Sequence, residues 1–337
     1  TVVLGPYSAL LPEIATTSRG RIVLSSTMGL FGALGMILGG AAGEMISQFP
    51  DGATLLGFTI PSGIQLVAVI GAASILLCLV PALNIRETGH SPAKEVTSSV
   101  WQGVRDAAQN PSFFPVVGIA FFFKLAGTMV VAMLPYLTTV VLERSPGVAG
   151  VVEEGMGEAW QSRLLAIVVI GAVLWMPFIH KIGARLSHKA MMTLAGGLYA
   201  AGMLALPASA LLPDPTWGVI AVMVVLSFPT SIAFVMPAVL FADVIDYDET
   251  LSGLRREGVY NGAVALLTKW SEGLARVLVV GLLAFGSSRE DALGIWLVAP
   301  TAGVSMLLGL FFFRRYPEAE MKAAIKAMKE REAEASG

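Results

Sequence analysis

The chain has 337 residues, of which 55% are hydrophobic and only 14% are charged, and its mean hydropathy is +0.74. This balance excludes an ordinary soluble domain and predicts a protein that lies in a lipid bilayer. The formal net charge of -2 excludes the strongly basic surface that would suggest a nucleic-acid partner.

Eight apolar segments are long enough to cross a bilayer, because about 20 residues span its hydrocarbon core. An open backbone cannot satisfy its hydrogen bonds in lipid, so we expect all eight segments to be helices. In chain order they cover residues 22–47, 58–83, 113–137, 164–182, 190–212, 216–241, 259–285 and 292–313. The sequence therefore predicts an all-α membrane protein with eight transmembrane helices.

Three polar stretches connect or follow these segments. The longest covers residues 84–110, and its part 101–108 could form a short interfacial helix. The Gly-rich and acidic stretch 143–161 is interpreted as a mobile loop on the other side of the membrane. The tail 317–335 has charges at helical spacing, which predicts a soluble helix without a chemical role of its own.

The distribution of Lys and Arg predicts how the chain is oriented in the membrane. With residues 16–21 placed in the cytoplasm, the basic residues outside the apolar segments lie on that side, apart from Arg144, Arg163 and Arg289. This bias follows the positive-inside rule, so we expect both termini on the cytoplasmic side. We further expect the plasma membrane of a bacterium or archaeon as the location.

Charged residues within the apolar segments mark the candidate site. Lys269, Glu272 and Arg276 have spacings of three and four residues, which place them on one face of the seventh segment. Such charges are expensive in lipid and by default face a lined cavity or an ion route. Lys269 lies near mid-depth, which disfavours the alternative of a snorkelling side chain. Lys124, in the third segment, either faces this cavity or pairs with an acid on a neighbouring helix, and Arg276 is either a gate residue or a partner of Glu272.

An acidic cluster and a basic pair flank the short connection between the sixth and seventh segments. The cluster consists of Asp243, Asp246, Asp248 and Glu249, and the pair consists of Arg255 and Arg256. They are either solvated loop charges or an ionic latch that closes the cytoplasmic mouth of a cavity. Surface ion pairs contribute only about 0–1 kcal/mol each, which suits a gate that must open readily. We favour the latch for Asp243 and Asp246.

Two blocks of sequence carry a resemblance to a known family. One is ADVIDYDETLSGLRREGVYNGAVALLTK at 242–269, and the other is PYSALLPEI at 6–14, followed by Arg21. Their order of acidic, aromatic and basic residues resembles the glycoside–pentoside–hexuronide:cation symporters, the melibiose permease-like family of the major facilitator superfamily. The resemblance implies the twelve-helix fold of that superfamily, of which this chain would hold the equivalents of helices 5–12.

This register divides the chain into four parts. Residues 1–83 would be a remnant of the N-terminal bundle, 84–112 the central cytoplasmic loop, 113–313 the C-terminal six-helix bundle and 314–337 a cytoplasmic tail helix. We therefore expect an N-terminal truncation, and no working transporter from these residues alone, because half of the alternating-access unit would be missing.

The resemblance also implies roles for individual residues. Lys269 matches a Lys of the cation and substrate region. Asp243, Asp246 and Arg255 match positions of gating contacts, to which we add Arg21. Arg256 belongs to the same predicted gate.

Four aromatic residues could stack on a sugar ring. Phe234 matches an aromatic position of the family, and Tyr7 lies in the block at 6–14. Tyr136 and Trp270 are further candidates. Each of the four could instead be a core or lipid-facing residue.

These observations predict a secondary active transporter that couples the movement of a sugar, glycoside or other small polar solute to Na⁺ or H⁺ by alternating access. Ser8 and Gly29 stand where sugar-transporting relatives carry an aromatic residue and a substrate-binding Arg, which leaves a lysolipid or another amphiphile open as the solute. A non-transporting receptor or scaffold of the same fold is a further alternative.

An enzyme is disfavoured because His90, His180 and His188 show no catalytic or metal-binding pattern with neighbouring residues. We expect no cofactor beyond the coupling cation, and no bound metal site. The expected partners are the small-molecule solute and the lipid bilayer, with no nucleic acid, and the protein is expected to be a monomer.

Overall fold

The computed structural model of the chain describes residues 18–40, 42–49, 51–55, 58–84, 105, 107–142, 157–183, 185–253, 256–288 and 290–336. The candidate residues Tyr7 and Arg255 lie outside these ranges, as do most of the polar stretch 84–110 and residues 143–156 of the predicted loop. Arg21 lies in a described helix, but its side chain lies outside the described part.

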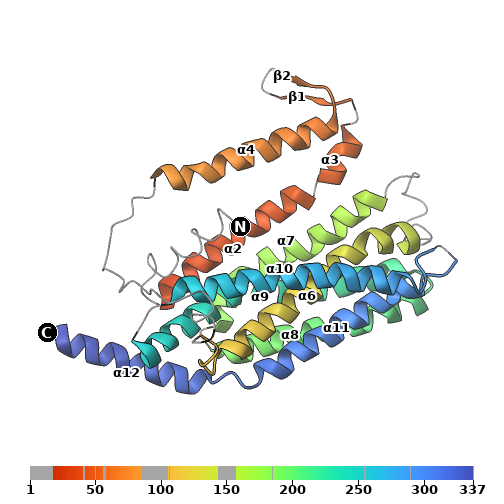
Figure 1. The fold of residues 1–337 in the computed structure, drawn as a ribbon. Coiled ribbons are helices and arrows are strands. Elements are labelled where there is room, and N and C mark those ends of the chain that lie inside the picture. The colour runs from red at the N-terminus through yellow and green to blue at the C-terminus, as the bar shows by residue number, and fades with distance from the viewer. Residues whose placement is uncertain are drawn as a thin grey trace.

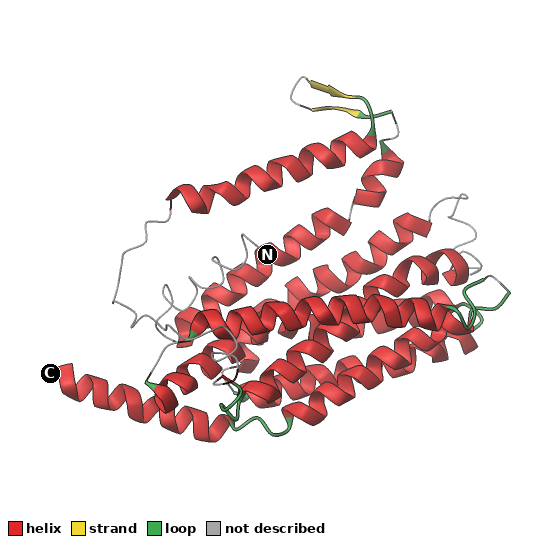
Figure 2. Ribbon diagram, in the orientation of Figure 1, coloured by secondary structure: helices red, strands yellow, loops and turns green. Residues whose placement is uncertain are grey.

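The described residues include a helix at each of the eight predicted segments (Figures 1 and 2). These helices are α2 (Ser18–Gly40), α4 (Gly63–Asn84), α6 (Phe113–Tyr136), α7 (Gly157–Gly183), α8 (His188–Ala205), α9 (Pro215–Ser252), α10 (Glu257–Leu283) and α11 (Leu293–Phe313). Five of them, α6 to α9 and α11, are long and apolar enough to cross a membrane, and α2 and α4 contain shorter apolar stretches. Helix α10 is not among those five, because it carries charged residues in its middle. The helices confirm the predicted all-α membrane fold.

Two of the membrane helices continue in another helical form. A π-helix (Leu137–Val141) follows α6, and a 3₁₀-helix (Leu206–Leu211) follows α8. Pro135 and Pro207 lie at these transitions. A proline has no backbone N–H to donate to the preceding turn, so the regular α-helical ladder changes there.

The N-terminal region differs from the prediction. The segment 22–47 is divided between α2 and a short helix α3 (Ala42–Gln48), and the next segment begins with a strand. Strands β1 (Ala53–Leu55) and β2 (Phe58–Ile60) pair antiparallel, with Ala53 opposite Ile60. Pro61 disfavours a helical residue before it, which explains why α4 starts only at Gly63. Gly52 has a φ of 83°, and a Cβ there would lie 1.7 Å from the Ile60 carbonyl oxygen, so this turn requires glycine.

Helix α9 is longer than predicted, with 38 residues. It begins at an N-cap in which the Asp214 carboxylate accepts a hydrogen bond from the Thr216 N–H, and it ends at Gly253, whose left-handed φ of 67° terminates it. A helix of this length measures about 57 Å, which exceeds the hydrocarbon core of about 30 Å. The acidic cluster, predicted to lie at the edge of a short turn, therefore belongs to a helical end that extends beyond the core. Helix α7 is longer than predicted as well, because residues 157–161 of the expected loop are helical.

Helices α6 to α11 form one bundle (Figure 1), in which α6 packs against α10 and α11, and α9 packs against α7 and α8. Helix α2 lies against α7 and α9, whereas α4 contacts α3 and β2 and stands apart from the bundle in Figure 1. The predicted tail helix is present as α12 (Glu318–Ser336), which packs against α9. The division into two bundles at 84–112 remains a prediction.

Candidate functional site

A triad of charged side chains joins α6 and α10 midway along the two helices. Glu272 Oε1 is 3.1 Å from Lys124 Nζ, and Glu272 Oε2 is 3.0 Å from Lys269 Nζ. Lys124 is the twelfth residue of α6 and Lys269 the thirteenth of α10, so both lie near the middle of their helices. The structure thus brings together three of the predicted site residues. It gives Lys124 the acidic partner that the sequence left open.

The three members of this triad differ in how open they are. The Glu272 side chain is 19% exposed, whereas those of Lys124 and Lys269 are 48% and 61% exposed. An exposed ammonium group at this depth is stable only beside water or a counter-charge, because lipid tails cannot solvate it. The open side of the triad is therefore suited to an aqueous route.

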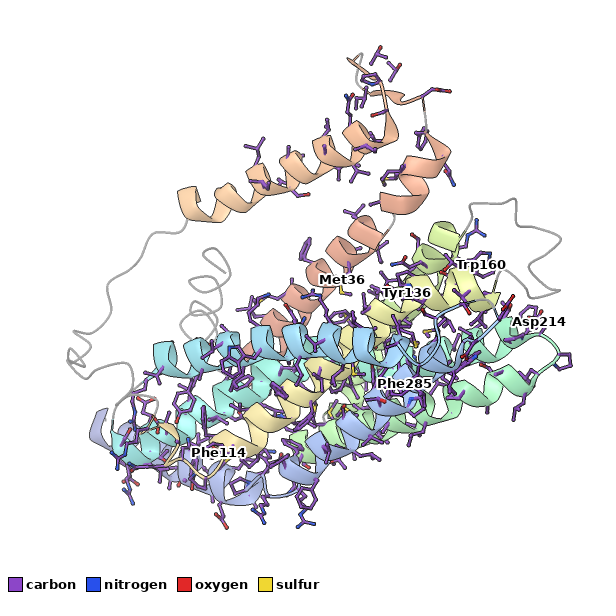
Figure 3. All side chains as sticks on the ribbon, turned by 45° about the vertical axis from the view of Figure 1, so that its right-hand side comes forward. Met36, Phe114, Tyr136, Trp160, Asp214 and Phe285 are labelled. Atoms are coloured by element: carbon purple, nitrogen blue, oxygen red, sulfur yellow. The ribbon has the colours of Figure 1, made fainter. Side chains whose placement is uncertain are left out.

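Of the aromatic candidates that the structure describes, Tyr136 lies far from this triad. Tyr136 is twelve residues beyond Lys124 on α6, about 18 Å along the helix. Figure 3 shows it toward the end of the bundle that carries Trp160 and Asp214, away from Phe114. Trp270 follows Lys269 directly and is 67% exposed.

Phe234 lies at the contact between α9 and α2. A Cβ added at Gly29 of α2 would lie 3.3 Å from the Phe234 Cβ and the same distance from its carbonyl oxygen. Gly29 thus permits a close approach of the two helices at the place where relatives were expected to carry a substrate-binding Arg. A long side chain at position 29 would have to displace α9.

A second group of polar residues joins α9, α10 and the start of α6. We call the end of the bundle where α6, α8 and α10 begin, and where Lys189, Arg314 and Arg315 lie, the basic end. Here Arg256 donates two hydrogen bonds to the Asp248 carboxylate, at 3.0 and 3.1 Å, and both side chains are buried.

Next to this pair, Asn110 links three helices. Its Nδ2 donates to the Tyr260 hydroxyl at 3.1 Å and to the Val244 carbonyl at 3.2 Å, and its Oδ1 accepts from Ser112. Asn110 is only 2% exposed. The sequence did not indicate this role, because Asn110 was expected to end a polar loop. The Asn-Pro pair before an apolar segment was the available signal, and it marks a helix start rather than a long-range contact.

Three of the latch residues that the structure describes, Asp243, Asp248 and Arg256, have partners within the bundle. Asp243 Oδ2 lies 2.9 Å from His188 Nδ1 at the start of α8, Arg256 binds Asp248, and Asp246 is buried. The latch across a cavity mouth stays a prediction, and its acidic members are located at the basic end.

The tail helix is fastened to this same end. The Glu318 carboxylate of α12 accepts hydrogen bonds at 2.9 Å from the backbone N–H groups of His188 and Lys189, the first two residues of α8. Lys322 lies 2.6 Å from it. Lys189 Nζ in turn donates to the carbonyl oxygens of Arg314 and Tyr316, at 2.7 and 2.8 Å.

This arrangement stabilises the ionised form of Glu318. Burial raises the pKa of its carboxyl group, but the hydrogen bonds from Lys322 and from the N–H groups of Lys189 and His188 together lower the pKa below its ordinary value. The start of a helix also favours a negative charge. The tail was predicted to be a soluble helix without a chemical role, and the structure gives it a structural role, because Glu318 caps the start of α8.

Comparison with known proteins defines the class. The family described as MFS/sugar transport protein matches residues 1–317, nearly the whole chain. The chain therefore belongs to this family of the major facilitator superfamily, whose members are membrane transporters, and the fold is that of the superfamily. The predicted superfamily is confirmed, whereas the melibiose permease-like subfamily remains a prediction.

Among solved structures, the chain is similar to a bacterial homolog of the human lysosomal transporter Spinster, crystallised in an inward-facing and unoccupied conformation. The identity is 17% and the TM-score 0.39, over 92% of this chain and 69% of that one. No match was found among the curated proteins.

Proposed function

We propose that the protein is a secondary active transporter that moves a sugar, a glycoside or another small polar solute together with Na⁺ or H⁺. The observation that carries this proposal is the triad of Lys124, Lys269 and Glu272 in the middle of two packed membrane helices. Transporters of this superfamily bind solute near the bilayer midplane, between halves that rock against each other. The family description, which includes sugar transport, supports the same reading.

The basic end provides the contacts that such a transporter needs at the cytoplasmic side. With that end placed in the cytoplasm, as the distribution of Lys and Arg predicts, the buried pair Asp248–Arg256 holds α9 and α10 together below the triad. The Asp243–His188 pair is more open, with side chains 24% and 16% exposed. This pair is only partly buried, so it should break at lower cost than the buried pair. It is the better candidate for a contact that opens and closes.

An amphiphile such as a lysolipid is the second candidate solute. Helix α10 carries exposed apolar side chains beside the triad. They are Leu266, Trp270, Leu274, Val277 and Val280, each 43% exposed or more. A solute with a polar head and an apolar chain would match charges and apolar surface on the same helix.

Transport by the protein expressed from its complete gene, reconstituted in proteoliposomes, tests the proposal. We expect uptake of at least one member of a panel of labelled sugars, small acids and lysophospholipids, increased by a Na⁺ or a proton gradient. Lys269→Ala should abolish coupled uptake while the protein still inserts, and Lys326→Ala on the exposed surface of α12 should not.

Normal coupled uptake by the Lys269→Ala variant would overturn the role of the triad. A properly inserted protein that shows no flux of any solute in the panel would overturn the transporter proposal and favour a receptor or scaffold. Stimulation by Na⁺ alone or by a proton gradient alone would identify the coupling ion.

A further inference from the structure

In the part of the chain that the structure describes, the charges in the middle of α6 and α10 do not balance. Among the described residues, the middle parts of α6 and α10 carry Lys124, Lys269 and Arg276 against the single carboxylate of Glu272. Helix α11 has no charged residue between Leu293 and Phe313, and the acids of α9 lie at its end, from Asp243 onward. An excess of positive charge at this depth attracts negative charge strongly, because water screens it poorly there.

We propose that Lys124 and Lys269 form a subsite for an anionic group of the solute, a carboxylate or a phosphate, and that Glu272 occupies this subsite when the solute is absent. The proposal rests on the transporter function proposed above and adds the charge of the solute. The subsite would recognise the anionic group and not the rest of the solute. A sugar acid, a sugar phosphate and a lysophospholipid all carry such a group.

The geometry of the triad supports an exchange of one anion for another. Each oxygen of Glu272 takes one ammonium group, at 3.1 and 3.0 Å, so the two ammonium groups are separated by a span that a single carboxylate or phosphate bridges. Each ammonium group has three N–H donors, so bonding to Glu272 does not exhaust it. The two lysine side chains are 48% and 61% exposed, whereas Glu272 is mostly covered, so an incoming anion reaches the lysines from the open side.

Substitutions of the two lysines and of Glu272 should therefore have opposite effects on the binding of an anion. Removing either lysine removes positive charge that the anion needs. Removing the charge of Glu272 removes the internal competitor, so binding of an external anion should strengthen. A triad that only fastened α6 to α10 would not show this opposition, because loss of any member would weaken the same contact.

The first test measures the electrostatic potential at the triad and requires no knowledge of the solute. A cysteine is introduced by Gly273→Cys, four residues after Lys269 on α10, in a protein whose native Cys78 is changed to Ser. A Cβ at Gly273 meets no described atom within 4 Å, so the change fits without displacing a neighbour. The thiol is modified with an anionic reagent, sulfonatoethyl methanethiosulfonate, and with a cationic one, trimethylammonioethyl methanethiosulfonate. The two modification rates are compared, each relative to the rate with a free thiol.

We expect the anionic reagent to be favoured. Lys124→Gln and Lys269→Gln should each lower the anion-to-cation rate ratio roughly fivefold, as expected for one unit charge at a distance of about 8 Å in a hydrated site. Glu272→Gln should raise the ratio by a similar factor. Lys326→Gln, which makes the same change of charge on the surface of α12, should leave it unchanged. A second thiol at Gly127→Cys on α6, where a Cβ is equally unobstructed, guards against a defect peculiar to one position.

The second test uses matched solutes in proteoliposomes. Glucose, glucosamine and glucuronate share a ring and differ in charge, and a lysophosphatidic acid compared with a monoacylglycerol repeats the comparison for an amphiphile. We expect the anionic member of a set to be taken up, or to inhibit uptake, at least fivefold more strongly than the neutral member. Glu272→Gln should lower the concentration of the anionic solute that is required for this effect.

Several results would overturn the proposal. One is a thiol that reacts faster with the cationic reagent while the triad is unchanged. Another is a thiol at either position that reacts with neither reagent. A third is a Glu272→Gln variant that lowers the anion-to-cation rate ratio as the lysine variants do. Transport limited to neutral or cationic solutes would overturn the anion subsite and leave the transporter function standing. Failure of all transport, together with a preference for the anionic reagent, would instead count against the transporter function.

Discussion

At the residue scale, the two groups of charges show how burial separates a fixed contact from an exchangeable one. Asp248 and Arg256 are 3% and 9% exposed and form two parallel hydrogen bonds, whereas the lysines of the triad are 48% and 61% exposed. A buried pair that loses one partner leaves an uncompensated charge in a poorly solvated place. An open pair loses much less, because water replaces the partner.

Arg256→Ala should therefore destabilise the protein strongly. We expect the free energy of unfolding to fall by about 3–5 kcal/mol, because the buried carboxylate of Asp248 loses its counter-charge. Arg256→Lys keeps the charge but not the paired geometry, so its effect should be intermediate. Thermal unfolding of the purified protein in detergent measures both, with Lys326→Ala as a control. A melting temperature for Arg256→Ala equal to that of the control would contradict the assignment.

At the element scale, two contacts between distant parts of the chain hold helices α2 and α12 against the bundle. Helix α2 approaches α9 closely at Gly29, and α12 is held against the start of α8 by Glu318. The local sequence predicted each of these helices, the tail helix from the spacing of its charges and the others from hydropathy. It could not predict either contact, because the partners are about 200 and 130 residues apart.

Gly29→Leu should separate α2 from α9. The added side chain meets the Phe234 backbone and Cβ at 3.3 Å, so α2 must move, at a cost of about 1–3 kcal/mol. Gly35→Leu is the matched control on the same helix, because no described atom lies within 4 Å of a Cβ at that position. Thermal unfolding compares the two variants. The close contact would be refuted by a Gly35→Leu variant that is as destabilised as Gly29→Leu.

Docking of the tail helix should depend on pH. The folded-state pKa of Glu318 is below 4.5, so its ionised carboxylate stabilises docking fully above that pH, and the stabilisation is lost as the pH falls through the folded-state pKa. Distances between spin labels on α8 and α12 should therefore lengthen and broaden below about pH 4.5. At neutral pH, Glu318→Gln should reproduce part of this change and Glu330→Gln should not. An unchanged distance distribution in Glu318→Gln would exclude this carboxylate as the fastening group.

At the scale of the whole molecule, composition predicted the class and failed at details that depend on three-dimensional contacts. Eight long apolar segments predicted eight helices, all of which the structure contains. The β1–β2 hairpin was missed because its strands have only three residues each and lie beside a membrane segment. Glu272, Lys124 and Lys269 were all chosen from their depth, yet the pairing of Lys124 could be determined only from the packing of α6 on α10.

The predicted orientation is a property of the whole chain and can be tested directly. In a Cys78→Ser background, a thiol introduced by Lys326→Cys on α12 should be labelled by an impermeant reagent in inside-out vesicles and not in right-side-out vesicles. A thiol introduced by Ser288→Cys, between α10 and α11, should show the opposite pattern. The reverse result for both positions would invert the assignment of the basic end to the cytoplasm.

The length of α9 has a mechanical consequence. Pro237 lies inside this helix, and prolines are the usual points of bending in helices. From Pro237 to the last residue, Ser252, is fifteen residues, or about 22 Å, so a bend of about 10° at the proline displaces the tip by about 4 Å. A displacement of that size is more than a hydrogen bond tolerates. The long helix can thus act as a lever, in which a small angular change within the lipid is amplified into the making or breaking of a contact outside it.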